Sequence, residues 1–370
     1  MKKVLITGSK GFIGKNLIER LNRIENIKIL TFDIENSIEE LEKNIKSADF
    51  IYHLAGINRP ENPEDFYKGN SDLVGNLISI LEKNKLNTPV LITSSIHADK
   101  DNDYGKSKLA GENLLKEYSE RNSANVYIYR LQNVFGKWCR PNYNSVVATW
   151  CYNTANDIEL QVNNRDTLIE FVYIDDVINS IVSHLNEVEK ENKLYYMVEK
   201  TYHRTLGEIQ DLLEFFKNNR KNLTIPHVGI GFERALYATY LSYLPKDRFS
   251  YELLEHSDVR GSFVEILRTV DSGQFSISTS KPGVTRGNHY HNTKNEKFLV
   301  IKGEAVIRFR HIFSDEIIKY PVSDKKLEVV DIPTGYTHNI TNTGNEDMVL
   351  VLWANEQFDK ENPDTYYLEV

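Results

Sequence analysis

The sequence is poor in cysteine, with only Cys139 and Cys151 among 370 residues. Two cysteines cannot build a disulfide framework, and so few thiols are typical of a reducing compartment. Long hydrophobic runs are also missing, so the sequence has no candidate for a membrane span. Only three consecutive apolar residues precede Thr7, which is too short for the core of a signal peptide. We therefore expect a cytoplasmic protein without a membrane partner.

An excess of positive charge is missing as well. The chain has 45 Lys and Arg against 53 Asp and Glu, a net charge of −8. This balance lacks the basic footprint of a duplex-binding protein, so we expect no nucleic-acid partner. Hydrophobic residues make up 40% and charged residues 26% of the chain, which argues against disorder. At about 150 residues per domain, the length predicts two domains.

The first 180 residues alternate short apolar runs with segments of helical apolar period. This alternation predicts βαβ units and a Rossmann-type, doubly wound parallel sheet, that is, an α/β fold. The expected strands are 3–7, 27–33, 49–54, 89–94 and 126–131, and the expected helices are 13–21, 38–48, 73–81 and 104–118.

A different pattern begins after Pro245, which ends an expected helix over 232–244. From residue 262 to 353, short β-rich runs are broken by Gly, Asn and Pro, and no helical period of useful length intervenes. This pattern predicts an antiparallel sandwich or barrel. We therefore expect an α/β domain over residues 1–245 and an all-β domain over residues 246–370.

Three glycines, Gly8, Gly11 and Gly14, lie between the first expected strand and the first expected helix. They allow a tight turn and a close backbone approach to a pyrophosphate, whose charge the helix amino terminus then holds. Asp33 ends the second expected strand, 19 residues after Gly14. An acid there accepts hydrogen bonds from the adenosine ribose, although it is also a common strand-end or helix-cap residue. The pattern predicts a dinucleotide site that favours NADH without excluding NADPH.

Tyr104 and Lys108 are four residues apart in an expected helix and so share one of its faces. A nearby ammonium favours the phenolate and lowers the pKa of a tyrosine, as acid/base work at neutral pH requires. The preceding strand ends in Thr-Ser-Ser, where a hydroxyl can join the same site, and Ser94 and Ser95 are both candidates. The three groups together indicate a catalytic site.

With these motifs, the amino-terminal half resembles the extended short-chain dehydrogenase/reductases that act on nucleotide sugars. The matching stretches are TGSKGFIG, HLAG, TSS, YGKSK, RLQNVFG and FVYIDDV. The resemblance implies that Ser95 polarises the substrate oxygen, that Tyr104 is the acid/base and that Lys108 assists. It also implies that Asn133 contacts the sugar nucleotide. Ser95 and Tyr104 are only nine residues apart, where the family usually has a longer loop. The implied cofactor-binding residues are Gly8, Lys10, Gly11, Phe12, Ile13, Gly14, Asp33, Leu54, Ala55, Gly56, Tyr104 and Lys108.

The β-rich half contains four potential metal ligands: His289, His291, Glu296 and His338. The two histidines of the His-x-His pair have strand spacing, so both imidazoles point to one face. Three neutral imidazoles and a carboxylate suit Zn²⁺ or another divalent metal ion. The pattern therefore predicts a metal site. The full spacing is Gly283-x5-His289-x-His291-x4-Glu296-x6-Gly303 and Pro333-x-Gly335-x2-His338-x3-Asn342.

These two blocks resemble the two motifs of the cupin family, except at Leu327, where the second motif usually has glycine. The stretches VTRGNHY and DVRGSF also resemble the deoxysugar 3,5-epimerases, which implies an active-site lysine at Lys297. Arg260 and Arg286 lie in these stretches, either in surface salt bridges, which contribute little, or as groups that recognise phosphate or carbonyl. In those metal-free epimerases the histidine at the place of His289 is the base. Because His289 is also a predicted metal ligand here, the identity of the epimerase base stays open.

From end to end, the chain resembles the bifunctional capsule-synthesis enzymes of the UDP-N-acetyl-L-fucosamine pathway, in which a reductase is fused to a cupin. The resemblance implies that the cupin inverts C3 of a UDP-2-acetamido-2,6-dideoxy-4-ketohexose. The reductase then uses NADPH, or NADH, to reduce C4, which gives UDP-2-acetamido-2,6-dideoxy-L-talose. It also implies a homodimer. Two alternatives stay open: a single-activity reductase with a structural or regulatory zinc cupin, and a non-catalytic sugar sensor on the same folds.

Overall fold

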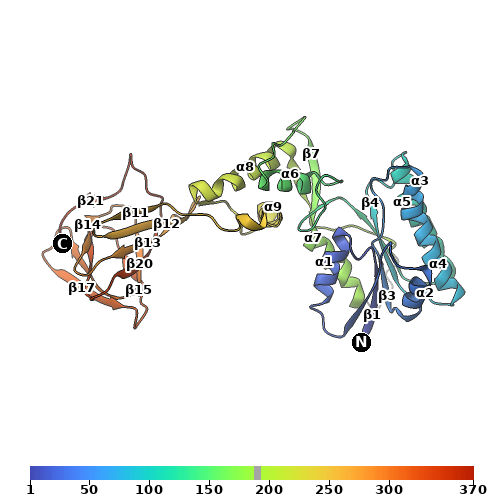
Figure 1. Cartoon of the computed structure of the whole chain (residues 1–370), viewed down its shortest axis with the longest axis horizontal. Coiled ribbons are helices and arrows are strands. Elements are labelled where there is room, and N and C mark those ends of the chain that lie inside the picture. Colours follow the sequence, from blue (N-terminus) through green and yellow to red (C-terminus); the bar gives the residue numbers. More distant parts are fainter. Residues whose placement is uncertain (187–192) are drawn as a thin grey trace. The chain divides into compact units, whose positions relative to one another are not determined.

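The computed structural model describes residues 1–186 and 193–370. The chain forms two compact units (Figure 1). The first consists of Met1–Leu213 and Ile230–Pro245, and the second of Glu214–Gly229 and Lys246–Val370. Residues 214–229, which the sequence assigned to the amino-terminal domain, group with the second unit. The reason is that β10 (Thr224–Ile225) pairs with β12 (Gly261–Thr269) of that unit.

A parallel sheet of six described strands forms the centre of the first unit, which confirms the predicted α/β fold. Its strand order is β2-β1-β3-β4-β5-β8, and neighbouring strands are parallel throughout. The order reverses between β1 and β3, and open α/β sheets bind ligands in the crevice at such a switch point. The strands are β1 (Lys2–Thr7), β2 (Ile27–Phe32), β3 (Phe50–His53), β4 (Val90–Ser95), β5 (Val126–Leu131) and β8 (Tyr195–Tyr196).

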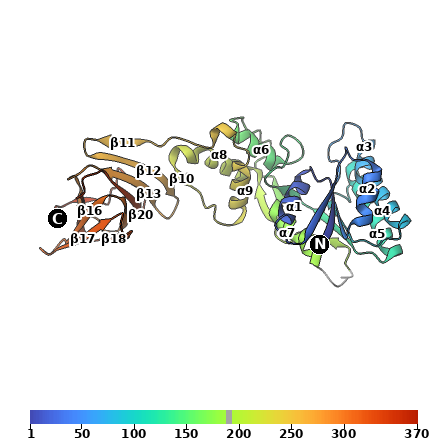
Figure 2. The same ribbon diagram turned by 60° about the horizontal axis from the view of Figure 1, so that its bottom comes forward.

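Helices cover both faces of this sheet because strand side chains alternate between two hydrophobic cores. Val4 and Ile6 of β1 share one core with Leu17 of α1, whereas Leu5 shares the other with Leu41 of α2. Figures 1 and 2 show α1 and α7 on one face and α2, α4 and α5 on the other. The helices are α1 (Phe12–Leu21), α2 (Ile38–Ser47), α4 (Leu73–Lys83), α5 (Asp103–Asn122) and α7 (Ile174–Ser183).

Local hydrogen bonds explain where two of these helices begin. The Ser37 hydroxyl accepts from the Glu40 amide at 3.3 Å, and the Glu40 carboxylate accepts from the Ser37 amide at 2.9 Å, which is a capping box at the start of α2. The Asn102 side chain accepts from the Gly105 amide at 2.8 Å. This cap starts α5, the helix that carries the predicted tyrosine–lysine pair.

The first unit also contains several elements that the sequence did not predict. β6 (Asn133–Phe135) lies parallel to β7 (Leu168–Tyr173), so the RLQNVFG and FVYIDDV motifs are neighbours in a small sheet with β9 (Tyr202–Thr205). The helix predicted over 232–244 is confirmed as α9 (Gly231–Leu241). The other elements of this unit include α3 (Glu64–Tyr67), the π-helical turn η1 (Lys68–Asp72), α6 (Val146–Ala155) and η2 (His184–Asn186), and α8 (Leu206–Asn222) begins in this unit and ends in the second.

Two largely antiparallel sheets form the second unit, which confirms the predicted all-β barrel (Figure 2). One has the order β10-β12-β13-β20-β15-β18 with β11 beside β12, and the other the order β17-β16-β19-β14-β21. Phe298 and Leu350 of the first sheet and Ile307 and Ile340 of the second share one hydrophobic core. The strands are β11 (Glu255–Asp258), β13 (Gln274–Ser280), β14 (Thr285–Tyr290), β15 (Glu296–Lys302), β16 (Glu304–His311), β17 (Ile317–Ser323), β18 (Val330–Ile332), β19 (Tyr336–Asn342), β20 (Met348–Ala354) and β21 (Tyr366–Tyr367).

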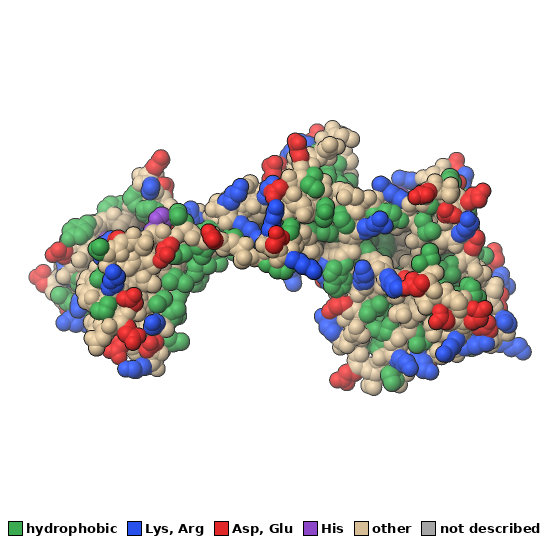
Figure 3. Space-filling model, in the orientation of Figure 1, with side chains coloured by type: hydrophobic (Ala, Val, Ile, Leu, Met, Phe, Trp, Pro, Cys, Tyr) green, Lys and Arg blue, Asp and Glu red, His purple; other side chains and the backbone are tan. Residues whose placement is uncertain are grey.

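The surface carries both signs of charge. Acidic and basic side chains are interspersed on the face drawn in Figure 3. Among the described helices, none combines the length and the apolar character that a membrane crossing requires.

Candidate functional site

The glycine loop lies where the sheet order reverses, between the end of β1 and the start of α1. Gly8 has a φ of +69°, and a Cβ there would lie 2.7 Å from the backbone nitrogen of Ala55, which follows β3. A Cβ on Gly14 would overlap the Gly8 carbonyl oxygen. Only glycine therefore fits these two positions. The loop therefore runs closely past β3 into the amino terminus of α1, and a helix amino terminus of this kind binds anions such as a pyrophosphate.

Asp33 reaches this loop from the end of β2. Its carboxylate accepts from the Ser9 hydroxyl and, at 3.3 Å, from the Lys10 amide. The Lys10 ammonium forms an exposed ion pair with Glu35. Asp33 thus fixes the shape of the glycine loop, and Lys10 places a cation beside it.

A cavity of about 750 Å³ opens beside the glycine loop. Most predicted cofactor-binding and catalytic residues line it, and Ala55 adjoins it through its contact with Gly8. His97 and Arg140 also line it, and no spacing motif in the sequence marks either residue. The lining includes Gly8, Lys10, Gly11, Phe12, Ile13, Gly14, Leu54, Gly56, Ser95, Tyr104, Lys108 and Asn133.

The short connection from Ser95 to Tyr104 folds back on the first turn of α5. The Ser95 hydroxyl accepts from the His97 amide at 3.1 Å, and the Ala98 amide donates to the Ser95 carbonyl at 3.0 Å. A Cβ on Gly105 would lie 2.6 Å from the His97 carbonyl oxygen, so this packing requires glycine there. The nine-residue separation therefore brings Ser95 within hydrogen-bonding reach of Tyr104.

Burial sets the protonation of the tyrosine–lysine pair. It raises the pKa of Tyr104, and the hydrogen bond with Ser95 opposes this only in part. The net shift of the Tyr104 pKa is therefore opposite to the lowering that the sequence predicts. The Lys108 ammonium lies beneath Gly56, where a Cβ would be 2.9 Å from Nζ, and 3.5 Å from the Thr93 carbonyl oxygen. Burial lowers the pKa of Lys108 to about 8, although the negative charge of Glu112 acts to raise it.

Ser94 has a different partner from Ser95. Its hydroxyl donates to Glu112 at 2.5 Å. The Glu112 side chain is fully buried and also accepts three hydrogen bonds from the Arg130 guanidinium, at 2.7, 3.0 and 3.2 Å. Because the Ser94 hydroxyl is engaged in this network, the geometry favours Ser95 as the hydroxyl that faces a substrate.

The four predicted metal ligands come together in the second unit. The ligand atoms of His289, His291, Glu296 and His338 lie within 4.8 Å of one another. Pairing of β14 with β19 places His289 directly opposite His338, and β15 begins with Glu296. Nε2 of His291 and both ring nitrogens of His338 are buried without a hydrogen-bond partner among the described residues. Buried polar atoms are nearly always paired, so this donor set fits a divalent cation.

The charge state of these groups also suits a cation. Burial by itself raises the pKa of Glu296, but the neighbouring His291 and His338 side chains and the charge of Lys294 hold it below its usual range. Burial and the neighbouring imidazoles lower the pKa of His289 to about 4. The cluster therefore presents a carboxylate and a neutral imidazole at neutral pH, which are the forms that bind metal.

Lys297 does not join this cluster, which corrects the expectation from the epimerase resemblance. Neighbouring residues of a strand point to opposite faces, so Lys297 faces outward when Glu296 faces the histidines. Lys297 pairs with the exposed Asp331 instead. The lysine at the cluster is Lys294, whose Nζ lies 3.7 Å from a Glu296 oxygen and whose side chain is 13% exposed.

The two predicted arginines have different surroundings. Arg286 pairs in register with Ile340, two positions from His338, and so shares the inner face of the sheet. Its guanidinium donates to the Ser280 hydroxyl at 3.1 Å and is half-buried. Arg260 pairs at 2.6 Å with Asp258 on an exposed hairpin. In the first unit, the predicted substrate residue Asn133 donates to the Glu170 carbonyl at 3.0 Å.

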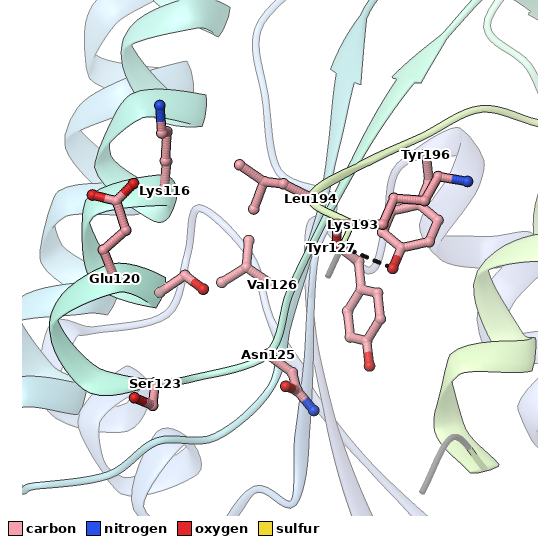
Figure 4. A pocket seen from close by; sticks show the side chains of 10 residues that line it. Lys116, Glu120, Ser123, Asn125, Val126, Tyr127, Lys193, Leu194 and Tyr196 are labelled. Carbon is pink, nitrogen blue, oxygen red and sulfur yellow. Dashed lines mark hydrogen bonds between the residues drawn. The ribbon is translucent and has the colours of Figure 1, made fainter. Parts of the chain in front are cut away.

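A second cavity, of about 440 Å³, lies at the opposite, amino-terminal end of β5 (Figure 4). Side chains from the end of α5 and from residues 193–196 line it, and the Tyr196 hydroxyl donates to the Lys193 carbonyl there. None of the site residues predicted from the sequence lies among its described lining residues. We therefore place the candidate active site in the larger cavity.

Comparison with protein families agrees with this geometry. Residues 4–197 match the model of the NAD dependent epimerase/dehydratase family, and residues 256–366 match the polysaccharide biosynthesis C-terminal domain. The chain belongs to the NAD dependent epimerase/dehydratase family. This membership confirms the predicted short-chain dehydrogenase/reductase relationship and implies a nicotinamide cofactor of the NAD(P) type.

Relatives of this family member extend over both units. The chain is 50% identical over 368 residues to the UDP-2-acetamido-2,6-beta-L-arabino-hexul-4-ose reductase of Pseudomonas aeruginosa, covering 100% of this chain and 99% of that one. It is 51% identical to the crystal structure of the capsular polysaccharide assembling protein CapF from Staphylococcus aureus, with a TM-score of 0.92 over 99% of this chain and 100% of that one. These matches confirm the resemblance to the capsule-synthesis enzymes. UDP-glucuronic acid 4-epimerase from Bacillus cereus, at 18% identity over 65% of this chain and 98% of that one, shares the fold with a TM-score of 0.56.

Removing one partner of the buried Glu112–Arg130 pair should strongly destabilise the first unit. Arg130→Met leaves the Glu112 carboxylate buried without its cation, which costs about 3–5 kcal/mol of unfolding free energy. Urea unfolding of the full chain, followed by tryptophan fluorescence, measures this. Arg23→Met is the matched control, because the Arg23–Glu19 pair is exposed and should contribute at most about 0.5 kcal/mol. Equal losses in the two variants would contradict the assignment.

Proposed function

We propose that this protein is an NAD(P)H-dependent UDP-4-ketosugar reductase whose cupin unit also acts as a 3-epimerase. The substrate is a UDP-2-acetamido-2,6-dideoxy-4-ketohexose, and the product is UDP-2-acetamido-2,6-dideoxy-L-talose for capsule or O-antigen synthesis. One observation carries the reductase part: Ser95, Tyr104 and Lys108 meet beside the glycine loop in one cavity. The relatives named for a ketosugar reductase and for CapF support the substrate class.

The charge of the cavity suits two diphosphate groups. Four charged side chains line it, Lys10, Lys15, Lys108 and Arg140, and all are cations, although the chain as a whole carries a charge of −8. A cofactor and a UDP-sugar each bring a diphosphate, so local attraction opposes the repulsion from the whole chain. We propose NADPH as the cofactor, because Lys10 supplies a cation near the ribose, with NADH as the alternative that Asp33 favours.

In the reductase site, the residues of the chain polarise and protonate the C4 oxygen. A reduced nicotinamide supplies the hydride when it is bound. Ser95 donates a hydrogen bond to the carbonyl oxygen, and the Tyr104 phenol gives its proton to that oxygen as charge develops. The raised pKa of Tyr104 keeps the phenol protonated at neutral pH, ready to donate. Lys108 contributes the nearby positive charge that stabilises the resulting phenolate.

In the cupin unit, the proposed step is inversion at C3. The C3 proton is acidic only because the neighbouring C4 carbonyl can become an enolate, so the enolate oxygen needs positive charge. His289, His291, Glu296 and His338 would hold Zn²⁺ or another divalent ion, which would supply that charge. Lys294 and the half-buried Arg286 add cationic groups on the same side. Reduction would remove the ketone that makes C3 acidic, so epimerisation comes first.

The alternative function is a single-activity reductase with a structural or regulatory zinc cupin. Four protein ligands favour it, because closed four-ligand sites usually mark structural zinc. Product analysis by NMR with the UDP-4-ketosugar, with and without NADPH, separates the two functions. Deuterium incorporation at C3 without cofactor supports the epimerase, whereas its absence in the wild-type protein supports the alternative.

Tyr104→Phe should remove reduction and spare C3 exchange. The variant lacks the proton donor for C4, so ketosugar reduction should fall by about 10²–10⁴-fold. C3 deuteration measured by NMR should continue at the wild-type rate, since the metal cluster is unchanged. His338→Ala is the reciprocal control and should abolish exchange while NADPH binding persists. Loss of exchange in Tyr104→Phe would contradict independent chemical roles for the two sites.

Replacing Ser95 by alanine should impair catalysis, whereas replacing Ser94 by alanine should mainly lower stability. Ser95→Ala removes a hydrogen bond to the developing charge and should lower kcat for reduction by about 10²-fold. Ser94→Ala should retain most of kcat but lower the melting temperature, because Glu112 loses a buried donor. Steady-state kinetics and thermal unfolding of both variants measure this. A large kcat loss in Ser94→Ala alone would reverse the assignment.

The kcat/KM of ketosugar reduction should fall in alkaline solution. The folded-state pKa of Lys108 is lowered to about 8, so the ammonium is present below that pH and is lost as the pH rises through it. We therefore expect kcat/KM to fall above about pH 8. In Lys108→Arg the cation persists to much higher pH, so that fall should vanish even if the rate is lower. An unchanged profile in Lys108→Arg would rule out Lys108 as the titrating group.

A further inference from the structure

We propose that Asp364, near the carboxyl terminus, is a positioning residue of the cupin metal centre. It holds His291 and the loop at residues 292–294 in the arrangement that binds the ion. The inference rests on the metal centre of the proposed function and concerns a residue of the chain that the metal motifs do not contain.

The Asp364 carboxylate organises the loop between two metal ligands. It accepts from the backbone amides of Asn292, Thr293 and Lys294, at 2.6 to 3.0 Å, and from the Thr293 hydroxyl at 3.0 Å. Three successive amides bound to one carboxylate leave this loop little freedom. The loop runs from His291 toward Glu296, so its shape sets the distance between these two ligands.

The backbone of Asp364 acts on His291 directly. Nδ1 of His291 lies 2.5 Å from the Asp364 carbonyl oxygen, an acceptor, so Nδ1 carries the proton and donates it. Nε2 is then the unprotonated nitrogen, and it faces the Glu296 carboxylate at 3.5 Å without another partner. A hydrogen bond of this kind fixes the tautomer and the ring orientation of a metal-binding histidine.

The residues after Asp364 fasten it to the ligand-bearing strands. β21 (Tyr366–Tyr367) pairs with β14 at His289 and Tyr290, and the rings of Tyr290 and Tyr366 stack at 5.3 Å. The Leu368 amide donates to the Asn288 carbonyl at 3.0 Å. Strand pairing of the residues that follow Asp364 therefore fixes its position relative to His291.

The test is the Zn²⁺ affinity of the full-length chain, measured by competition with a chromophoric chelator. Asp364→Ala keeps the backbone carbonyl that binds His291 but removes the carboxylate that holds residues 292–294, so Zn²⁺ binding should weaken by about 10-fold, the lower end of the usual effect of losing an outer partner. Asp364→Asn keeps one side-chain acceptor oxygen and should lie between Asp364→Ala and the wild type. Asp359→Ala is the matched control, because Asp359 is exposed in the same carboxy-terminal segment and accepts from the Glu361 amide there. Its affinity should match that of the wild type.

Thermal unfolding separates positioning from a general loss of stability. A ligand that binds only the folded state stabilises it by RT ln(1 + [L]/Kd), so the weaker Zn²⁺ binding of Asp364→Ala should reduce the melting-temperature gain on adding Zn²⁺. The metal-free melting temperature should fall much less. If Asp364→Ala binds Zn²⁺ with wild-type affinity while His338→Ala loses the ion, the positioning role of Asp364 is overturned and the metal centre stands. Zn²⁺ bound with unchanged affinity in His338→Ala would overturn the metal centre itself.

Discussion

The buried Glu112 carboxylate ties together the elements that carry the reductase chemistry. It lies on α5, four and eight residues beyond Lys108 and Tyr104, and so on the same helical face. It binds Arg130 of β5 and the Ser94 hydroxyl of β4. A charge buried this deeply is tolerated only with such partners. Helix and strands are therefore locked in one register, and Ser95 reaches Tyr104 as a consequence. The proposed proton donor is thus positioned by an ion pair whose carboxylate lies eight residues further along its own helix.

The cupin unit also buries polar groups that need partners, but here a metal ion would supply the partner. Nε2 of His291 and both ring nitrogens of His338 are buried and have no protein partner among the described residues, and an unpaired buried polar atom costs about 1–3 kcal/mol. A cation removes that cost, which couples metal binding to the stability of the barrel. The cluster also draws ligands from both sheets, His289 and His338 from one and Glu296 from the other. The ion would therefore act as a cross-link between them.

Sequence spacing predicted the parts of the fold and the site that depend on local geometry. The glycine loop, the Tyr104–Lys108 pair and the four metal ligands follow from turns, helical period and strand alternation. Lys297 was assigned by alignment to a motif, although its place beside Glu296 in one strand already requires the opposite face. The contact between Asp364 and His291 could not be predicted from spacing, because the two residues are 73 positions apart in the sequence. The three-residue strand β6 was missed for the same reason: a neighbouring strand stabilises it and its own pattern does not.

Under the proposed function, the two sites would meet the same chemical problem, charge on the C4 oxygen, with different groups. Inversion at C3 returns the carbonyl, so the positive charge that stabilises the enolate would have to leave the oxygen unprotonated at the end, as a fixed cation would. Reduction ends with a hydroxyl, so the oxygen needs a proton that stays, and the Tyr104 phenol, which is protonated at neutral pH, would supply it. A phenol near the enolate would risk trapping it, and a fixed cation alone could not complete the reduction. The difference in end product would therefore explain why one chain has two sites.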